Sequence, residues 1–113
     1  TRIFSRMLNS DKFETEAIII YPTSNQPSPK NGLAEISFIK ESGDIISREI
    51  IIPRNGLVKL KFDKFDNEVT NFLTNQTHYT LMVKSKNFKF YGFHLTTKKN
   101  SSRGIAMDHF FGG

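Results

Sequence analysis

The chain has 113 residues, with 16 basic and 11 acidic side chains, a formal net charge of +5, and neither cysteine nor tryptophan. This length fits one domain, and the lack of cysteine excludes disulfides, thiolate chemistry and cysteine-based zinc sites. No apolar run reaches the roughly 20 residues that a membrane-spanning helix needs. The positive charge favours anionic partners, although a soluble domain also needs a net charge of about this size.

The first half of the chain predicts β-strands. Residues 2–8 and 15–21 are rich in β-forming side chains, and the NSD sequence between these runs is typical of a turn. Residues 22–32 hold three of the four prolines, which predicts an exposed loop because proline cannot donate to a β-ladder. Residues 33–52 then alternate around the turn sequence ESGD, as a β-hairpin does.

The second half adds one helical turn to this pattern. Residues 57–62 alternate apolar and polar side chains, which indicates a half-buried strand. In residues 64–73 apolar side chains recur every three or four positions, so we expect a short helical turn. Residues 78–84 and 88–95 resume the strands. The whole pattern predicts an all-β, antiparallel sandwich of about seven to eight strands, with a jelly roll or an OB-like barrel as alternatives.

The sequence LTNQTHYTLMV places Leu73 six residues before Tyr79. This spacing resembles the tyrosine corner of fibronectin type III and other immunoglobulin-like sandwiches. The resemblance implies that Leu73 packs under the tyrosine ring and that the hydroxyl bonds back to the backbone of the loop. It also implies that residues 57–62, 78–84 and 88–95 are the fifth, penultimate and last strands. The core tryptophan that is common in those families is absent.

Lysines and aromatic residues alternate between residues 84 and 95. Exposed rings flanked by cations are typical of proteins that bind single-stranded nucleic acid. A nucleic-acid-binding β-barrel would use Lys84, Lys86, Lys89, Tyr91 and Phe93. However, successive rings in a strand point to opposite faces, so the stretch is apolar on both sides. This favours a structural hairpin whose rings belong to the core.

Three histidines, His78, His94 and His109, lack the short spacing that pre-organises a zinc site. The adjacent pair Asp108 and His109 could transfer a proton, but the sequence indicates no nucleophile beside it. We therefore expect no catalytic residue, no metal and no cofactor. A small β-sandwich enzyme or metal protein stays as a further alternative.

The sandwich is expected to span residues 1–98, followed by a partly apolar tail at residues 99–113. Apolar side chains return at the end of this tail and must be buried somewhere. We expect the tail to pack on its own sandwich as an edge strand, or to add a strand to a neighbouring copy and so form a homo-oligomer.

These features together predict a non-catalytic binding or structural module of a larger surface or extracellular assembly. The chain starts at Thr1 without methionine, so we expect a processed or excised piece of a longer protein, secreted or at the cell surface rather than cytoplasmic. Protein or glycan partners would contact loops and edges, since a rigid sandwich leaves these free to vary. The candidate partner-binding residues are Lys84, Lys86, Lys89, Tyr91, Arg103, Phe110 and Phe111.

Overall fold

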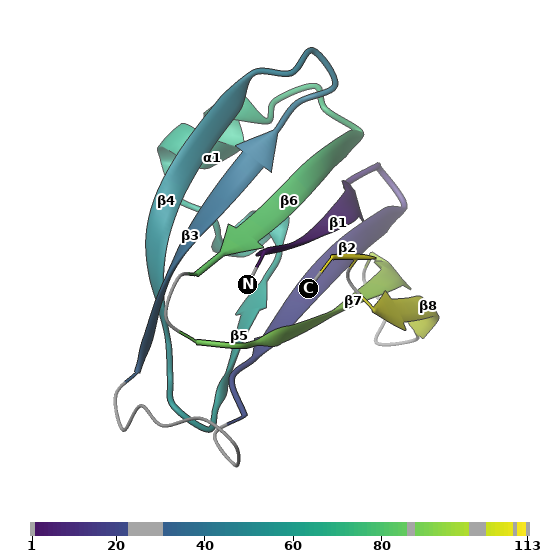
Figure 1. Cartoon of the computed structure of the whole chain (residues 1–113). Coiled ribbons are helices and arrows are strands. Elements are labelled where there is room, and N and C mark those ends of the chain that lie inside the picture. Colours follow the sequence, from purple (N-terminus) through teal and green to yellow (C-terminus); the bar gives the residue numbers. More distant parts are fainter. Residues whose placement is uncertain (1, 23–30, 86–87, 100–103, 110, 113) are drawn as a thin grey trace.

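Two antiparallel sheets face each other in the computed structural model of the protein (Figure 1). The structure describes residues 2–22, 31–85, 88–99, 104–109 and 111–112, with side chains described up to residue 99. Among these residues, no helical segment has both the length and the apolar character that crossing a bilayer requires. The predicted all-β antiparallel sandwich is confirmed.

Nine strands and two short helical segments make up the described chain. The first sheet has the order β4-β3-β6-β1-β9 and contains β1 (Arg2–Leu8), β3 (Gly32–Ile39), β4 (Ile45–Ile52), β6 (His78–Lys84) and β9 (Phe111–Gly112). The second has the order β5-β2-β7-β8 and contains β2 (Phe13–Ile20), β5 (Leu57–Leu60), β7 (Tyr91–Lys98) and β8 (Gly104–His109). Between β5 and β6 lie η1 (Phe62–Lys64) and α1 (Asn67–Phe72), which confirm the helical turn expected in residues 64–73.

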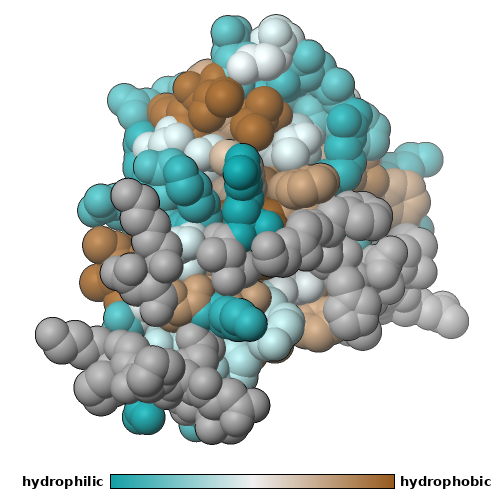
Figure 2. All heavy atoms as spheres, viewed as in Figure 1, coloured by the Kyte–Doolittle hydropathy of each residue, from teal (hydrophilic) through white to brown (hydrophobic). Residues whose placement is uncertain are grey.

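The core lies between the sheets, where alternate residues of each strand meet. In β1 and β2 the inward positions include Met7 and Ile19, and in β6 they include Leu81, all 0 % exposed. Burying a side chain of this size stabilises the fold by about 1.5–3 kcal/mol relative to exposure. Outward positions are largely hydrophilic, with hydrophobic residues gathered in a few places (Figure 2).

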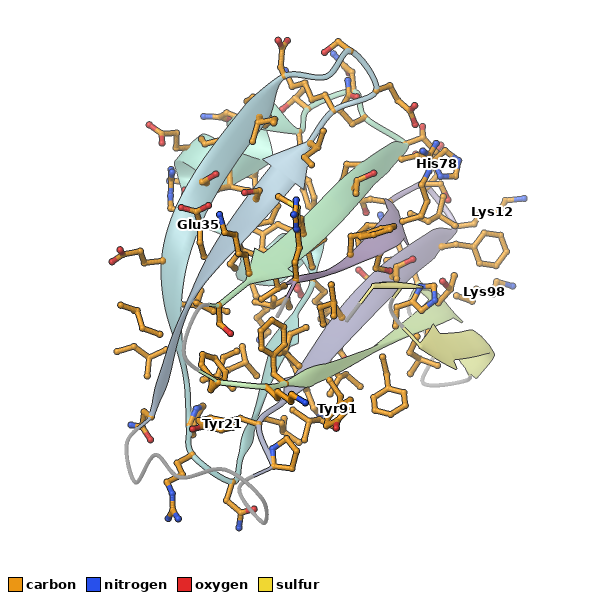
Figure 3. All side chains as sticks on the ribbon, viewed as in Figure 1. Lys12, Tyr21, Glu35, His78, Tyr91 and Lys98 are labelled. Carbon is orange, nitrogen blue, oxygen red and sulfur yellow. The ribbon has the colours of Figure 1, made fainter. Side chains whose placement is uncertain are left out.

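An aromatic cluster fills one end of the sandwich, where Tyr21 leaves β2 (Figure 3). The ring centroids of Tyr21 and Phe88 lie 4.5 Å apart, and those of Phe88 and Phe90 lie 5.3 Å apart. The Ser85 hydroxyl donates to the Phe88 carbonyl oxygen at 2.7 Å. Phe88 and Phe90 are therefore core residues, as expected, although they precede β7 instead of belonging to it.

The hairpin expected from residues 78–84 and 88–95 is wrong. β6 belongs to the five-stranded sheet and β7 to the four-stranded sheet, so the chain crosses between the sheets after Lys84. A connection through buried Phe88 and Phe90 anchors this crossing in the core. Phe88 and Phe90, two of the rings that make residues 84–95 apolar on both faces, thus lie in the connection between the sheets.

The outer strand positions also differ from an immunoglobulin domain. There the last strand pairs with the penultimate one and the first strand pairs with the second. Here β1 pairs with β6, and β7 pairs with β2. β1 and β7 therefore each lie in the sheet opposite to that of the first or last strand of an immunoglobulin domain. The other neighbours agree: β2 pairs with β5 as the second strand does with the fifth, and β3 pairs with β6 as the third does with the penultimate one. The immunoglobulin-like assignment stays a prediction.

The C-terminal segment contributes one strand to each sheet. Along β8, Leu95 pairs with Met107, and along β9, Phe4 pairs with Phe111. Figure 1 shows the C-terminal end close to β1. The described backbone of the expected tail thus packs on its own sandwich, with β8 and β9 each forming an edge strand of one sheet.

The corner residues Leu73 and Tyr79 are both 1 % exposed, which agrees with the expected packing of an aliphatic side chain and a ring. The Tyr79 ring also meets the Phe65 ring, with centroids 6.4 Å apart. Its hydroxyl is buried, however, and has no hydrogen-bond partner in the structure, so the expected bond back to the loop is wrong. Burial raises the pKa of this hydroxyl, and the negative charge of Glu14 raises it further.

Gly32→Ala should destabilise the fold. A Cβ at position 32 would lie 2.4 Å from Cζ of the Phe88 ring, so the aromatic cluster would have to shift. Overpacking of this kind costs about 1–3 kcal/mol, measurable as a lower free energy of unfolding in urea. In a Phe88→Leu background the same substitution should cost much less, because the clashing atoms are gone. Equal costs in the two backgrounds would contradict the contact.

Tyr79→Phe should leave the free energy of unfolding unchanged or raise it by up to about 1–3 kcal/mol, since it removes a buried hydroxyl without a partner. Because the pKa of Tyr79 is raised in the folded state, its ionisation favours the unfolded chain, so the wild type loses stability as the pH rises above the usual pKa of about 10. The variant should therefore resist alkaline unfolding better than the wild type. Denaturant melts between neutral and alkaline pH test this. A loss of about 1 kcal/mol at neutral pH would mean that the hydroxyl has a partner after all.

Candidate functional site

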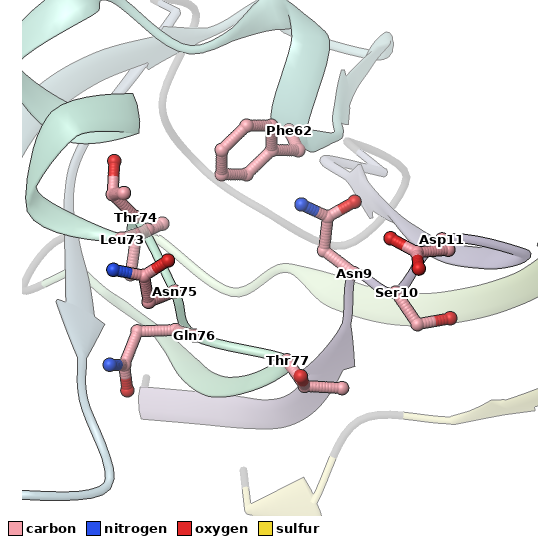
Figure 4. Close-up of a pocket in the computed structure, with 9 residues that line it drawn as sticks. All are labelled: Asn9, Ser10, Asp11, Phe62, Leu73, Thr74, Asn75, Gln76 and Thr77. Carbon is pink, nitrogen blue, oxygen red and sulfur yellow. The ribbon is translucent and has the colours of Figure 1, made fainter.

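A polar cavity opens at one end of the sandwich, between the β1–β2 turn and the loop that precedes β6 (Figure 4). Its volume of about 560 Å³ lies within the range of small-molecule sites, roughly 300–1,000 Å³. The lining residues are Asn9, Ser10, Asp11, Phe62, Leu73, Thr74, Asn75, Gln76 and Thr77.

The β1–β2 turn is held by its own backbone. The Asn9 N–H donates to the Thr77 carbonyl oxygen at 2.7 Å and so joins the turn to the opposite loop. The Ser10 N–H donates to the Phe13 carbonyl oxygen at 2.9 Å. The two walls of the cavity are therefore connected by a main-chain hydrogen bond.

The opposite wall continues from the end of α1. The Leu73 N–H donates to Val69 at 3.0 Å, and the Gln76 N–H donates to Leu73 at 3.0 Å, so the chain turns sharply after the helix. Asn75 completes this turn with a φ of 68°. Asparagine tolerates this left-handed region better than other residues with a side chain, although glycine fits it best.

The backbone of both loops is thus satisfied locally, while several side chains at the cavity are not used. Within the described part of the chain, no side-chain hydrogen bond is recorded for Asn9, Asp11, Asn75, Gln76 and Thr77. A side-chain amide offers both hydrogen-bond donors and acceptors, and a hydroxyl offers one donor and two acceptor lone pairs. Half-buried Phe62 supplies apolar surface beside these polar groups, whereas Leu73 is 1 % exposed and belongs to the core beneath them. The cavity is consequently suited to a neutral ligand with many hydroxyl or amide groups.

α1 positions the second wall, and a carboxylate holds its first turn. The Asp66 carboxylate accepts from the Val69 N–H at 3.0 Å and from Arg48 Nε at 3.1 Å. Arg48 also pairs with Glu68. The Val69 N–H, and then Arg48, lower the pKa of Asp66. The helix start is therefore fixed to β4 through Arg48.

The candidate partner-binding residues whose side chains are described do not form one surface. Lys84 is exposed on the outer side of the five-stranded sheet, whereas Tyr91, 58 % exposed, lies on the outer side of the four-stranded sheet with Phe93 (Figure 3). Lys89 is exposed before β7. In the alternative interpretation as a stacking platform these residues would share one face, but Lys84 lies on one sheet and Tyr91 and Phe93 lie on the other.

The other candidates of this group lie at the limits of the described chain. Lys86, Arg103 and Phe110 fall outside the described residues. Phe111 belongs to β9, where only its backbone is described.

The histidines are separate from the cavity. His78 is exposed at the start of β6, and His94 is half-buried in β7. In the register of β7 and β8, His94 pairs with Asp108, while His109 pairs with Phe93. Among the described residues no group of three or more histidines or carboxylates is placed to hold a metal ion.

Sequence reasoning missed the cavity itself. It assigned Asn9, Ser10 and Asp11 to a turn and residues 73–77 to a structural corner. The enrichment in amide and hydroxyl side chains was visible in both segments. What the sequence did not reveal is that Leu8 pairs with His78, which brings the two segments together.

Comparisons with known proteins describe the fold. No family model matches the chain, and no curated protein matches it. A solved structure from Thermotoga maritima, "Crystal Structure of Thermotoga maritima 1070", is similar, with a TM-score of 0.66 over 97 % of this chain and 91 % of that one. The two sequences are 13 % identical, so the likeness shows a shared fold alone.

Asp66→Ala should lower the midpoint of thermal unfolding at neutral pH, because the first turn of α1 loses its capping carboxylate. The lowered pKa means that this contribution is complete above the usual pKa of about 3.9 and is lost as the pH falls below it. The difference between wild type and variant should therefore shrink in acid. Asp66→Asn is the matched control, since asparagine also caps helices. A difference that is constant with pH would contradict the assignment.

Proposed function

We propose that the protein is a non-catalytic binding module that recognises a neutral glycan in the cavity between residues 9–11 and 73–77. The observation that carries this proposal is the group of unused amide and hydroxyl side chains beside the half-buried ring of Phe62. Sugar hydroxyls both donate and accept, so amide side chains match them, while Phe62 can cover part of the apolar side of a sugar ring. A secreted or cell-surface protein would meet such ligands.

The charge of the cavity favours this ligand over nucleic acid. Among the described lining residues, Asp11 is the one with a full charge, and none is a lysine or arginine. Nucleic-acid binding depends on cations that neutralise phosphates, whereas a carboxylate repels them. A catalytic function has less support, because the described part of the lining offers no histidine to activate the hydroxyls of Ser10, Thr74 or Thr77.

The fixed backbone of the cavity should reduce the entropic cost of binding. The hydrogen bond from Asn9 to Thr77 and the turn at Asn75 keep the loops in place before a ligand arrives. Pre-organised loops lose less freedom on binding than loops that must be ordered. A single sugar contacts few atoms, however, so we expect weak affinity for one cavity, on the order of millimolar.

Asn75→Gly should separate ligand binding from stability. Glycine adopts the φ of 68° without strain, so the fold should be retained or stabilised by about 0.5–1 kcal/mol, while the amide that faces the ligand is lost. We expect at least a fivefold loss of affinity, about 1 kcal/mol, as one hydrogen bond contributes. The matched control is Asn55→Gly, which makes the same change at a φ of 57° in the turn between β4 and β5.

Binding can be measured with an array of neutral and acidic oligosaccharides, followed by amide NMR titration with each neutral sugar that binds. We expect chemical shift changes in residues 9–11 and 73–77, reduced by Asn75→Gly and unchanged by Asn55→Gly. If no neutral oligosaccharide binds, or if the shifts map to the outer faces of the sheets, the proposal is wrong.

A further inference from the structure

The outer side of the five-stranded sheet is unusually apolar for a surface that faces solvent. Among the described residues six large hydrophobic side chains are strongly exposed, and four of them lie here: Phe4 at 44 %, Leu33 at 60 %, Ile45 at 57 % and Ile51 at 63 %. Figure 2 shows hydrophobic atoms at the top of the view, near the ends of β3 and β4, and again at the left edge. By strand register Leu33 and Ile51 are neighbours, while Ile45 and Phe4 lie in other rows, so charged residues and serines alternate with the apolar side chains on this surface.

A row of four charges crosses the same side of the sheet. By strand register, Glu49 of β4 lies beside Glu35 of β3, Glu35 beside Lys84 of β6, and Lys84 beside Arg2 of β1. All four side chains are exposed, and no ion pair within 4.0 Å is recorded between them. The row contains two pairs of like-charged neighbours, Glu49 with Glu35 and Lys84 with Arg2, and each pair destabilises a single copy. One half of the row is therefore acidic and the other half basic.

We propose that a second copy of this chain packs face to face on the outer side of the five-stranded sheet. A two-fold axis parallel to the strands, between β3 and β6, reverses the charge row of the second copy. Glu35 then faces Lys84 of the second copy, and Glu49 faces its Arg2, so one row makes four ion pairs. A two-fold interface requires such self-complementarity.

The neighbouring row is complementary in size under the same operation. It consists of Ser47, Ser37, Met82 and Phe4 in register. Met82 faces Ser37 of the second copy, and Phe4 faces its Ser47, so a large side chain meets a small one each time. Ser37 is already 3 % exposed in a single copy, and its hydroxyl bonds to that of Ser47 at 2.9 Å, so the further burial of the exposed Ser47 costs little.

The arrangement has a consequence for the cavity, which rests on the proposed function. An axis parallel to the strands keeps their direction, so both cavities open at the same end of the dimer. Two weak sites held in this way bind a repetitive or surface-bound glycan more tightly than either site alone.

Sedimentation velocity from about 10 µM to about 1 mM tests the dimer. We expect a species of twice the 13.0 kDa chain mass, weakened by added salt. Lys84→Glu should weaken dimerisation at least about tenfold, because position 84 occurs twice in a two-fold interface and each glutamate would face Glu35 of the other copy. The exchange of both charges, Glu35→Lys with Lys84→Glu, should restore the dimer. Lys59→Glu, on the outer side of the other sheet, is the matched control and should have no effect.

Phe4→Ser gives a second variant that changes no charge and should also weaken the dimer. It decides the question if circular dichroism shows that Lys84→Glu does not fold. A monomer at every concentration, a dimer that Phe4→Ser or folded Lys84→Glu leaves unaffected, or a double variant that stays monomeric would each overturn the proposal.

Discussion

Burial of one side of each sheet against the other is the constraint on which the structure depends. Because side chains alternate along a strand, fixing Met7, Ile19 and Leu81 in the core also fixes which residues face outward. A register shift of one residue would exchange the two sets. The packing of the core thus determines the outer charge row as well, since Lys84 points outward because Val83 points inward.

Much of the fold could be predicted because alternation is a local property. The hairpin of β3 and β4, the strand at β5 and the helical turn before β6 all follow from the spacing of apolar residues. The path after Lys84 could not be predicted in this way, because Phe88 and Phe90 look like strand residues and their sheet depends on distant partners. The hydrogen bond expected for the Tyr79 hydroxyl was wrong for a related reason. The spacing predicts that the ring is buried, but it does not predict which atoms surround the hydroxyl.

The cavity was harder to predict than the fold, since no single segment contains it. Asn9 and Asp11 come from one end of the chain, and Asn75 and Gln76 lie more than sixty residues later. Only the pairing of β1 with β6 makes them neighbours. The amide and hydroxyl composition of each loop was a usable signal, but turns contain such residues for structural reasons as well. Separating the two explanations requires knowing which side chains the turn leaves unused.

The pairing of β1 with β6 and of β2 with β7 also determines the order in which the chain can fold. β1 cannot pair until β6 is made, since Ile3 pairs with Val83. β2 can pair with β5 earlier, but its other edge is completed only by β7, where His94 pairs with Ala17. During synthesis the N-terminal strands therefore emerge long before their partners, and the β3–β4 hairpin is the first pairing that neighbours in sequence can make. Such distant pairings slow folding and leave apolar strands open to aggregation in the meantime. A nascent chain released before residue 98 would lack part of β7 and would leave an edge of β2 without its full partner.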